Sequence, residues 1–187
     1  ATPQPVLPAV PESRSFDADA PILLNDGGEE ITVSVQEFLI GTAASELPPD
    51  WPDDAVLAQM AAAHSYALSL GGAAFTCNSA QCAGWTSAEV LRARWGGDFA
   101  TYYSRLAELA DEVSGAVLCW DGAPAAACYH SSSAGQTEAS QNVWLTAVPY
   151  LQGVASPWDT DAPGFETSVT YLSLIHISEP TRPLYIS

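Results

Sequence analysis

The sequence contains no lysine, and its five cationic side chains are all arginines, set against 22 aspartates and glutamates. The formal net charge is −17 at pH 7 and the isoelectric point is about 4.1. Nucleic acids and anionic lipids attract basic surfaces, so this charge balance excludes nucleic acid as a partner and excludes polybasic membrane contact. No apolar run approaches the roughly 20 residues that a helix needs to cross a bilayer.

Cysteine is also scarce, with four in 187 residues. Cys77 and Cys82 are close in sequence, and so are Cys119 and Cys128. The even number permits two disulfides, one metal site or four free thiols. A structural zinc site needs four ligands, and no C-x-x-C pair is present, so thiols or a local disulfide are favoured over zinc.

The remaining composition is that of one folded domain, because 48% of the residues are hydrophobic and 10% are aromatic. Residues 1–19 are predicted to be a proline-rich linker. Residues 172–187 resemble the translation of a DNA-sequencing adapter, and we exclude them from the fold. We therefore expect the domain to span residues 20–171 and to be truncated at its C-terminus.

Hydrophobic periodicity predicts an α+β fold around one buried helix. That helix is Ala-rich, begins with Asp53 or Asp54 as its cap, runs to about Leu70 and is apolar on nearly every face. The other predicted elements are strands over 20–24 and 30–35, helices over 35–45, 87–94 and 98–113, a loop over 73–86, a hairpin with arms 116–120 and 125–130, and a strand-like segment over 150–154.

Glu46 is the first candidate catalytic residue. It ends a predicted helix and is followed by Leu47, two prolines and Trp51. A carboxyl group held against an indole and prolines loses hydration, which favours the neutral form that a general acid needs. The alternative is an ordinary solvated glutamate that closes a helix.

Two histidines offer further candidates. His64 lies within the apolar helix, where it is either a core histidine or a polar group facing a cleft. His130 precedes three serines, which could suggest a Ser-His-Asp hydrolase. That signal is weak, because no strand–elbow–helix pattern surrounds the serines.

Three blocks of sequence carry a family resemblance. Residues 31–68 include Phe38-Leu39-Ile40-Gly41, Glu46-Leu47-Pro48 and the run VLAQMAAAHSYAL; residues 117–138 read VLCWDGAPAAACYHSSSAGQTE; and residues 143–159 read VWLTAVPYLQGVASPWD. In this order and spacing, the blocks resemble the stage II sporulation protein D family, also called the amidase-enhancer family. The resemblance covers residues 31–159.

The resemblance implies a lytic transglycosylase that cleaves peptidoglycan glycan strands to 1,6-anhydro products. It implies that Glu46 is the catalytic acid and that no second carboxylate is obligatory, while Glu138 is structural or orients the substrate. The residues predicted to bind substrate are His64, Gln81, Tyr129 and Ser131. Some family members hold zinc on cysteines near Cys77 and Cys82, but no matching histidine stands beside them, so no metal or other cofactor is predicted.

This sequence departs from the family pattern at four positions. Leu57 replaces a lysine and His64 replaces an arginine, which removes two cations. Leu47 replaces a methionine and Ala134 a glycine. The lost cations favour the alternative function within the family, a non-catalytic enhancer of a cell-wall amidase.

The resemblance also implies a location and partners. Peptidoglycan lies outside the cytoplasm, so the protein is expected to be extracytoplasmic, with a membrane anchor ahead of the linker in the full-length protein. Its predicted partners are peptidoglycan glycan strands and other wall hydrolases such as an amidase. The predicted process is removal of septal peptidoglycan during engulfment of the forespore.

Overall fold

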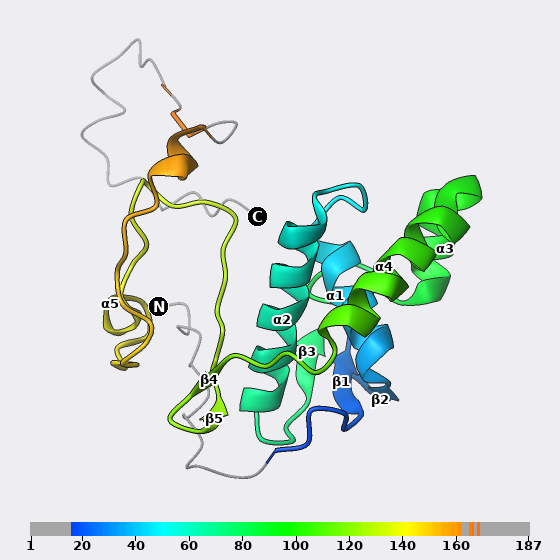
Figure 1. Ribbon diagram of the computed structural model, residues 1–187, viewed down its shortest axis with the longest axis horizontal. Helices are drawn as coiled ribbons and strands as arrows, with labels where there is room; N and C mark the ends of the chain where they lie inside the picture. Colours follow the sequence, from blue (N-terminus) through cyan, green and yellow to red (C-terminus); the bar gives the residue numbers. More distant parts are fainter. Residues whose placement is uncertain (1–15, 162–164, 167, 169–187) are drawn as a thin grey trace, which may run out of the picture.

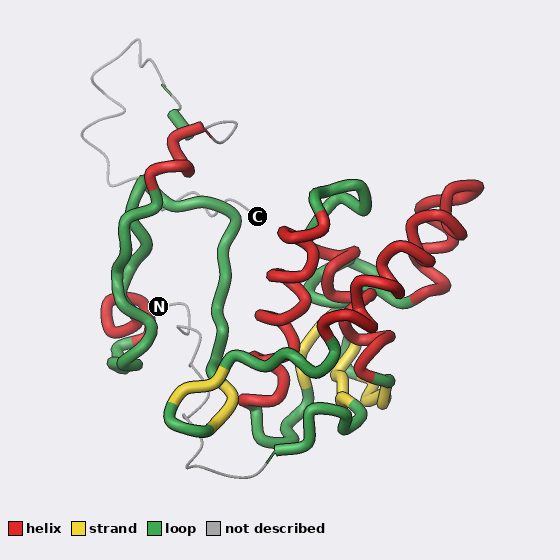
Figure 2. The backbone as a smooth tube through the Cα atoms, viewed as in Figure 1, coloured by secondary structure: helices red, strands yellow, loops and turns green. Residues whose placement is uncertain are grey.

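The computed structural model describes residues 16–161, 165–166 and 168 (Figure 1). It is a mixed α+β structure, as predicted, with helices packed against a small sheet (Figure 2). No helix in these ranges is long and apolar enough to span a bilayer. The predicted linker over 1–19 and the predicted adapter segment over 172–187 lie largely or wholly outside the described residues.

The first two strands form the predicted hairpin. β1 (Ile22–Asp26) and β2 (Glu29–Val33) pair antiparallel, with Leu24 opposite Ile31. Gly27 and Gly28 in the connecting turn have φ values of 62° and 104°, which favour glycine.

The two long helices follow. α1 (Val35–Glu46) begins with a capping box: the Ser34 hydroxyl accepts from the Glu37 N–H, and the Glu37 carboxylate accepts from the Ser34 N–H at 3.0 Å. α2 (Asp53–Ser69) was predicted to be buried on nearly every face, but only seven of its 17 residues are buried, and Asp53, Asp54 and Ala58 are exposed. The predicted cap was wrong: Pro52 occupies the cap position without a side-chain bond, and both aspartates lie in the first turn, where the helix dipole favours negative charge.

A third strand lies where the sequence predicted a loop. β3 (Phe75–Cys77) pairs parallel with β1, so the sheet order is β2-β1-β3. Its three residues are too short to show alternation along the sequence, and its position depends on a partner about 50 residues earlier. The prediction of loop over 73–86 was therefore wrong at these three residues.

The next helices match the predictions closely. α3 (Ala88–Trp95) has Ser87 as its N-cap, with the hydroxyl accepting from the Val90 N–H at 3.3 Å. A short 3₁₀ turn, η1 (Gly96–Asp98), leads into α4 (Phe99–Val113).

The predicted hairpin forms, but it is shorter than expected. β4 (Cys119–Trp120) and β5 (Ala123–Pro124) flank Asp121 and Gly122, whose φ values of 51° and 77° fit a tight hairpin turn. Pro124 has no N–H to continue the ladder. The arms predicted over 116–120 and 125–130 were therefore too long.

Residues 125–161 carry little regular structure; they first run alongside α2 and then turn away from it (Figure 1). They include a short helix, α5 (Ser140–Trp144), that was not predicted, and a 3₁₀ turn, η2 (Pro157–Asp161). The strand-like prediction over 150–154 was wrong, because this region pairs only through one isolated bridge between Gln136 and Ala155.

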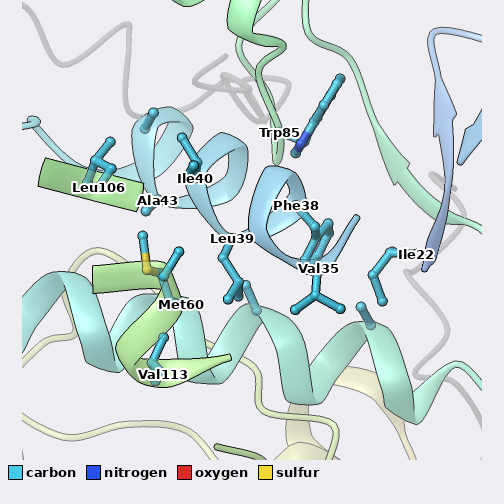
Figure 3. Packing of buried hydrophobic residues seen from close by; sticks show 14 of the residues in the cluster. Ile22, Val35, Phe38, Leu39, Ile40, Ala43, Met60, Trp85, Leu106 and Val113 are labelled. Atoms are coloured by element: carbon cyan, nitrogen blue, oxygen red, sulfur yellow. The ribbon is translucent and has the colours of Figure 1, made fainter. Parts of the chain in front are cut away.

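The main core lies where α1 packs on α2 and α4. Val35 and Leu39 point from α1 toward α2, and Met60 of α2 fills the space beside α4 (Figure 3). Complete burial of an aliphatic side chain of this size contributes about 1.5–3 kcal/mol. Other residues of this core with no more than 1% exposure are Leu24, Phe38, Ile40, Val56, Ala63, Leu91, Leu106 and Ala110.

Candidate functional site

Glu46 is the last residue of α1, and its side chain is exposed, so the predicted loss of hydration against Trp51 and the prolines was wrong. Ala43 and Ala44, in the turn before it, are buried in the core. The helix ends here because Leu47 is extended (φ −126°, ψ 148°) and the following prolines cannot continue it. The fold thus presents one carboxyl group at the open end of a firmly packed helix.

The segment that follows Glu46 is held by an arginine from α4. The Arg105 guanidinium donates to the Pro49 carbonyl at 2.5 Å and to the Trp51 carbonyl at 2.6 Å. It also makes an ion pair with the Asp53 carboxylate at the start of α2. One side chain therefore joins the whole connection between α1 and α2 to a third helix.

Tyr129 comes to the same place from a distant part of the sequence. After β5 the chain runs alongside α2 (Figure 1), and the Cys128 thiol adds to the raised pKa of Tyr66 on that helix. Burial raises the pKa of Tyr129 to about 12, and the negative charge of Glu46 adds to the rise, while the Gln59 amide opposes it. The phenol therefore stays protonated and can donate a hydrogen bond close to Glu46.

His64 is not at this surface. Its side chain is completely buried. Burial lowers the pKa of His64, and the Ala18 backbone and the Asp19 carboxylate partly oppose that effect. The structure thus places His64 against the segment before β1 rather than beside Glu46 and Tyr129.

Gln81 and Ser131 are exposed on loops. Gln81 lies in the turn closed by the bridge between Asn78 and Ala83. Arg94 connects that turn to α1, because its guanidinium contacts the Cys82 sulfur and donates to the Ala44 carbonyl at 3.1 Å. Ser131 follows Tyr129 by two residues, and the substrate-binding roles of Gln81 and Ser131 stay predictions.

The serines after His130 do not form a hydrolase triad. The Ser133 hydroxyl donates directly to the Asp159 carboxylate, and the Ser133 N–H donates to the same oxygen at 2.8 Å. These two bonds, a third from Ser156 and the nearby His130 lower the pKa of Asp159. In a triad the histidine lies between serine and aspartate, whereas here the aspartate joins the serine loop to η2.

Glu138 has a structural role at the start of α5. Its carboxylate accepts from the Asn142 amide at 2.6 Å and from the Ala139 N–H at 3.0 Å. Both bonds lower the pKa of Glu138. This is a carboxylate stabilising the N-terminal end of a short helix.

All four cysteines are free thiols in the structure. Cys77 is buried, and burial raises its pKa to about 11. Within the part of the chain that the structure describes, no three His, Cys, Asp or Glu side chains are grouped to hold a metal ion.

The family described as "Stage II sporulation protein" matches residues 28–120, which include β2, α1 with Glu46 at its end, and α2 to α4. The chain belongs to the stage II sporulation protein D family. Stage II sporulation protein D of Bacillus amyloliquefaciens is 26% identical over 176 residues, which cover 87% of this chain and 50% of that protein. The sporulation protein D family resemblance predicted from the sequence is thereby confirmed.

Two Bacillus subtilis (strain 168) proteins are also similar. Stage II sporulation protein D is 28% identical over 152 residues, covering 74% of this chain and 43% of that protein. A protein named "Amidase enhancer" is 32% identical over 113 residues, covering 60% of this chain and 14% of that protein. The chain spans about half the length of the sporulation proteins that it matches or less.

Sequence reasoning missed Arg105 as part of this family member's site. Its contacts join residues more than 50 positions apart, and the sequence around it reads as an ordinary amphipathic helix. Gln59 gave a weak signal, because it is one of few polar residues within an apolar helix.

Proposed function

We propose that the protein is a peptidoglycan lytic transglycosylase in which Glu46 is both the general acid and the general base. The observation that carries the proposal is the exposed position of Glu46 at the end of the packed helix α1, with its charge among the causes that raise the pKa of Tyr129. The two residues come from separate blocks of the family pattern and are 83 positions apart (129 − 46). A carboxyl group offers a proton donor to a glycosidic oxygen, and a protonated phenol offers a hydrogen-bond donor to a sugar.

The reaction needs one carboxyl group. Protonated Glu46 gives its proton to the oxygen of the glycosidic bond, and the bond from C1 to that oxygen breaks through an oxocarbenium-like state. The 6-hydroxyl oxygen of the same sugar then bonds to C1, and the Glu46 carboxylate takes the proton that this hydroxyl loses. Glu46 is regenerated, no water is consumed, and the product carries a 1,6-anhydro ring.

Tyr129 and Trp51 suit the remaining needs of a glycan site. Trp51 is 46% exposed and Tyr129 is 41% exposed, so part of each aromatic side chain is accessible to a sugar ring. The Tyr129 hydroxyl is a donor to sugar hydroxyl or ring oxygens across the neutral pH range. In this proposal the protein acts outside the cytoplasm on septal peptidoglycan during sporulation, with glycan strands as its polymeric partner.

The test is product analysis with a matched pair of variants. Glycan strands stripped of stem peptides are incubated with wild-type protein, Glu46→Gln and Glu112→Gln, and the fragments are identified by mass spectrometry. Glu112 is a control because it is an exposed glutamate on α4 without a hydrogen bond to its side chain among the described residues. We expect anhydro-ended fragments from the wild type and Glu112→Gln only.

A second candidate function is a peptidoglycan-binding enhancer of a cell-wall amidase. The observation that favours it is the similarity to the protein named "Amidase enhancer", together with Leu57 and the buried His64 at the two cationic positions of the family pattern. Stimulation of an amidase by folded protein that yields no anhydro products would establish this function and refute the transglycosylase.

A further inference from the structure

The residues that connect α1 and α2 make few hydrogen bonds among themselves. Three of its six residues, 47–52, are prolines, which have no N–H to donate. The Trp51 N–H bonds to the Pro48 carbonyl at 3.2 Å, and the Pro52 carbonyl accepts from the first turn of α2. Within the described residues, Arg105 supplies the hydrogen bonds that join this connection to any element other than the two helices it links.

The chemistry of Arg105 suits this task. A guanidinium is a rigid, planar group with five N–H donors and stays charged at every physiological pH. Here it satisfies two carbonyl oxygens and one carboxylate at once, and its side chain is 29% exposed. A lysine ammonium on a flexible stem cannot hold the same three acceptors in one geometry.

The base of the arginine is itself fixed. Leu106, the next residue of α4, is 1% exposed and lies in the core beside α1 (Figure 3). The guanidinium therefore holds the residues that directly follow Glu46 in a fixed position relative to α4.

We infer that Arg105 is a positioning residue for the Glu46 site: it fixes the 47–53 connection, and with it the direction in which the Glu46 carboxyl group and the Trp51 ring point. The inference rests on the proposed transglycosylase function. Reacting groups must lie within a narrow range of distance and angle, and a displacement of about 1 Å can cost on the order of 100-fold in rate. Arg105 does not touch the reacting atoms and is not a catalytic residue.

The experiment compares Arg105→Gln and Arg105→Lys with Arg92→Gln. Arg92→Gln is the control because it also removes one guanidinium. The carbon of that group lies 4.3 Å from the centre of the Phe99 ring, away from the connection between α1 and α2. Each variant is checked for folding by its melting temperature, and kcat and KM are measured separately on glycan strands stripped of stem peptides.

We expect Arg105→Gln to lower kcat by about 10- to 100-fold while KM stays within about twofold, because the loss concerns geometry in the transition state. Arg105→Lys should fall between Arg105→Gln and the wild type, and Arg92→Gln should keep the wild-type kcat. If Arg105→Gln does not fold, Arg105→Lys decides: a severalfold loss of kcat supports the inference and an unchanged kcat overturns it.

Three outcomes would overturn the inference. They are an unchanged kcat in Arg105→Gln, a raised KM with unchanged kcat, and an equal loss of kcat in Arg92→Gln. Each of these requires an active wild type. Wild-type protein that yields no anhydro products would instead refute the proposed function, and the role of Arg105 with it. The activity of the wild type therefore distinguishes failure of the proposed function from failure of the Arg105 inference.

Discussion

Gly41 is the residue at which one added methyl group should do most damage to α1. It lies in the middle of the helix, and the Trp85 indole rests directly on it. A Cβ at this position would stand 2.2 Å from the indole nitrogen and 2.8 Å from the Thr86 carbonyl oxygen. Neither neighbour can move freely, because the Trp85 N–H donates to the Glu37 carbonyl at 3.3 Å and the Thr86 N–H donates to the Gly41 carbonyl at 3.1 Å.

The size of the effect follows from three contributions. Overpacking a filled site costs about 1–3 kcal/mol. Loss of the indole hydrogen bond adds about 0.5–1.5 kcal/mol. The higher helix propensity of alanine offsets about 1 kcal/mol of this loss. We therefore expect Gly41→Ala to lower the free energy of unfolding by about 0.5–3.5 kcal/mol, or roughly 1–14 °C in melting temperature for a chain of this size.

The assay is thermal unfolding by circular dichroism, with Gly97→Ala as the matched control. Gly97 has no heavy atom within 4 Å of an added Cβ, so alanine should be tolerated there. Gly41→Ala should also cost less in a Trp85→Ala background, where the clashing ring is absent. An equal loss in both backgrounds, or a stable Gly41→Ala, would refute the packing argument.

Two further predictions concern α2. Because burial lowers the pKa of His64, the unfolded chain binds the proton first as the pH falls below about 6.5. The free energy of unfolding should therefore decrease by up to about 1.4 kcal/mol per pH unit. Melting curves from pH 7.5 to 5 should show this loss of stability, and His64→Leu should make the melting temperature less dependent on pH. The buried Ser65 hydroxyl accepts from the Leu118 N–H at 2.8 Å, so Ser65→Ala should cost about 1–3 kcal/mol in chemical denaturation by leaving that donor unpaired, whereas Ser45→Ala, which removes a hydroxyl without a partner among the described residues, should cost little.

These two predictions also have clear failures. A His64→Leu variant with the same pH dependence as the wild type would assign the acid sensitivity to other groups. A Ser65→Ala variant as stable as Ser45→Ala would mean that water replaces the lost hydroxyl.

The elements that the sequence predicted well are those with strong local signals. Ser87 is a cap that marks where a helix begins, and Asp121-Gly122 marks a hairpin turn. Long apolar periodicity located α2. In each case the information lies within a few residues of the feature.

The elements that were missed depend on distant partners. β3 exists because β1 offers it an edge, and Arg105 matters because a loop more than 50 residues earlier lacks donors. Local sequence predicted only part of the proposed site. Glu46 was predicted from the residues around it, whereas Tyr129 was predicted from the family pattern. His64 was predicted at a cleft, but the segment before β1 covers it, and nothing in the helix sequence indicates that cover.

The central place of β1 has a consequence for synthesis of the chain on the ribosome. Its partner β2 ends at Val33, but its other partner, β3, ends at Cys77, which is 44 residues later (77 − 33). At about 5–20 residues per second, one edge of β1 waits roughly 2–9 s for its neighbour. During that time an unpaired edge next to Leu24 is a template for strands of other nascent chains. Substitutions that make this edge pair more readily with strands of other chains should therefore reduce the yield of folded protein in cells. The melting temperature of the purified protein should stay unchanged.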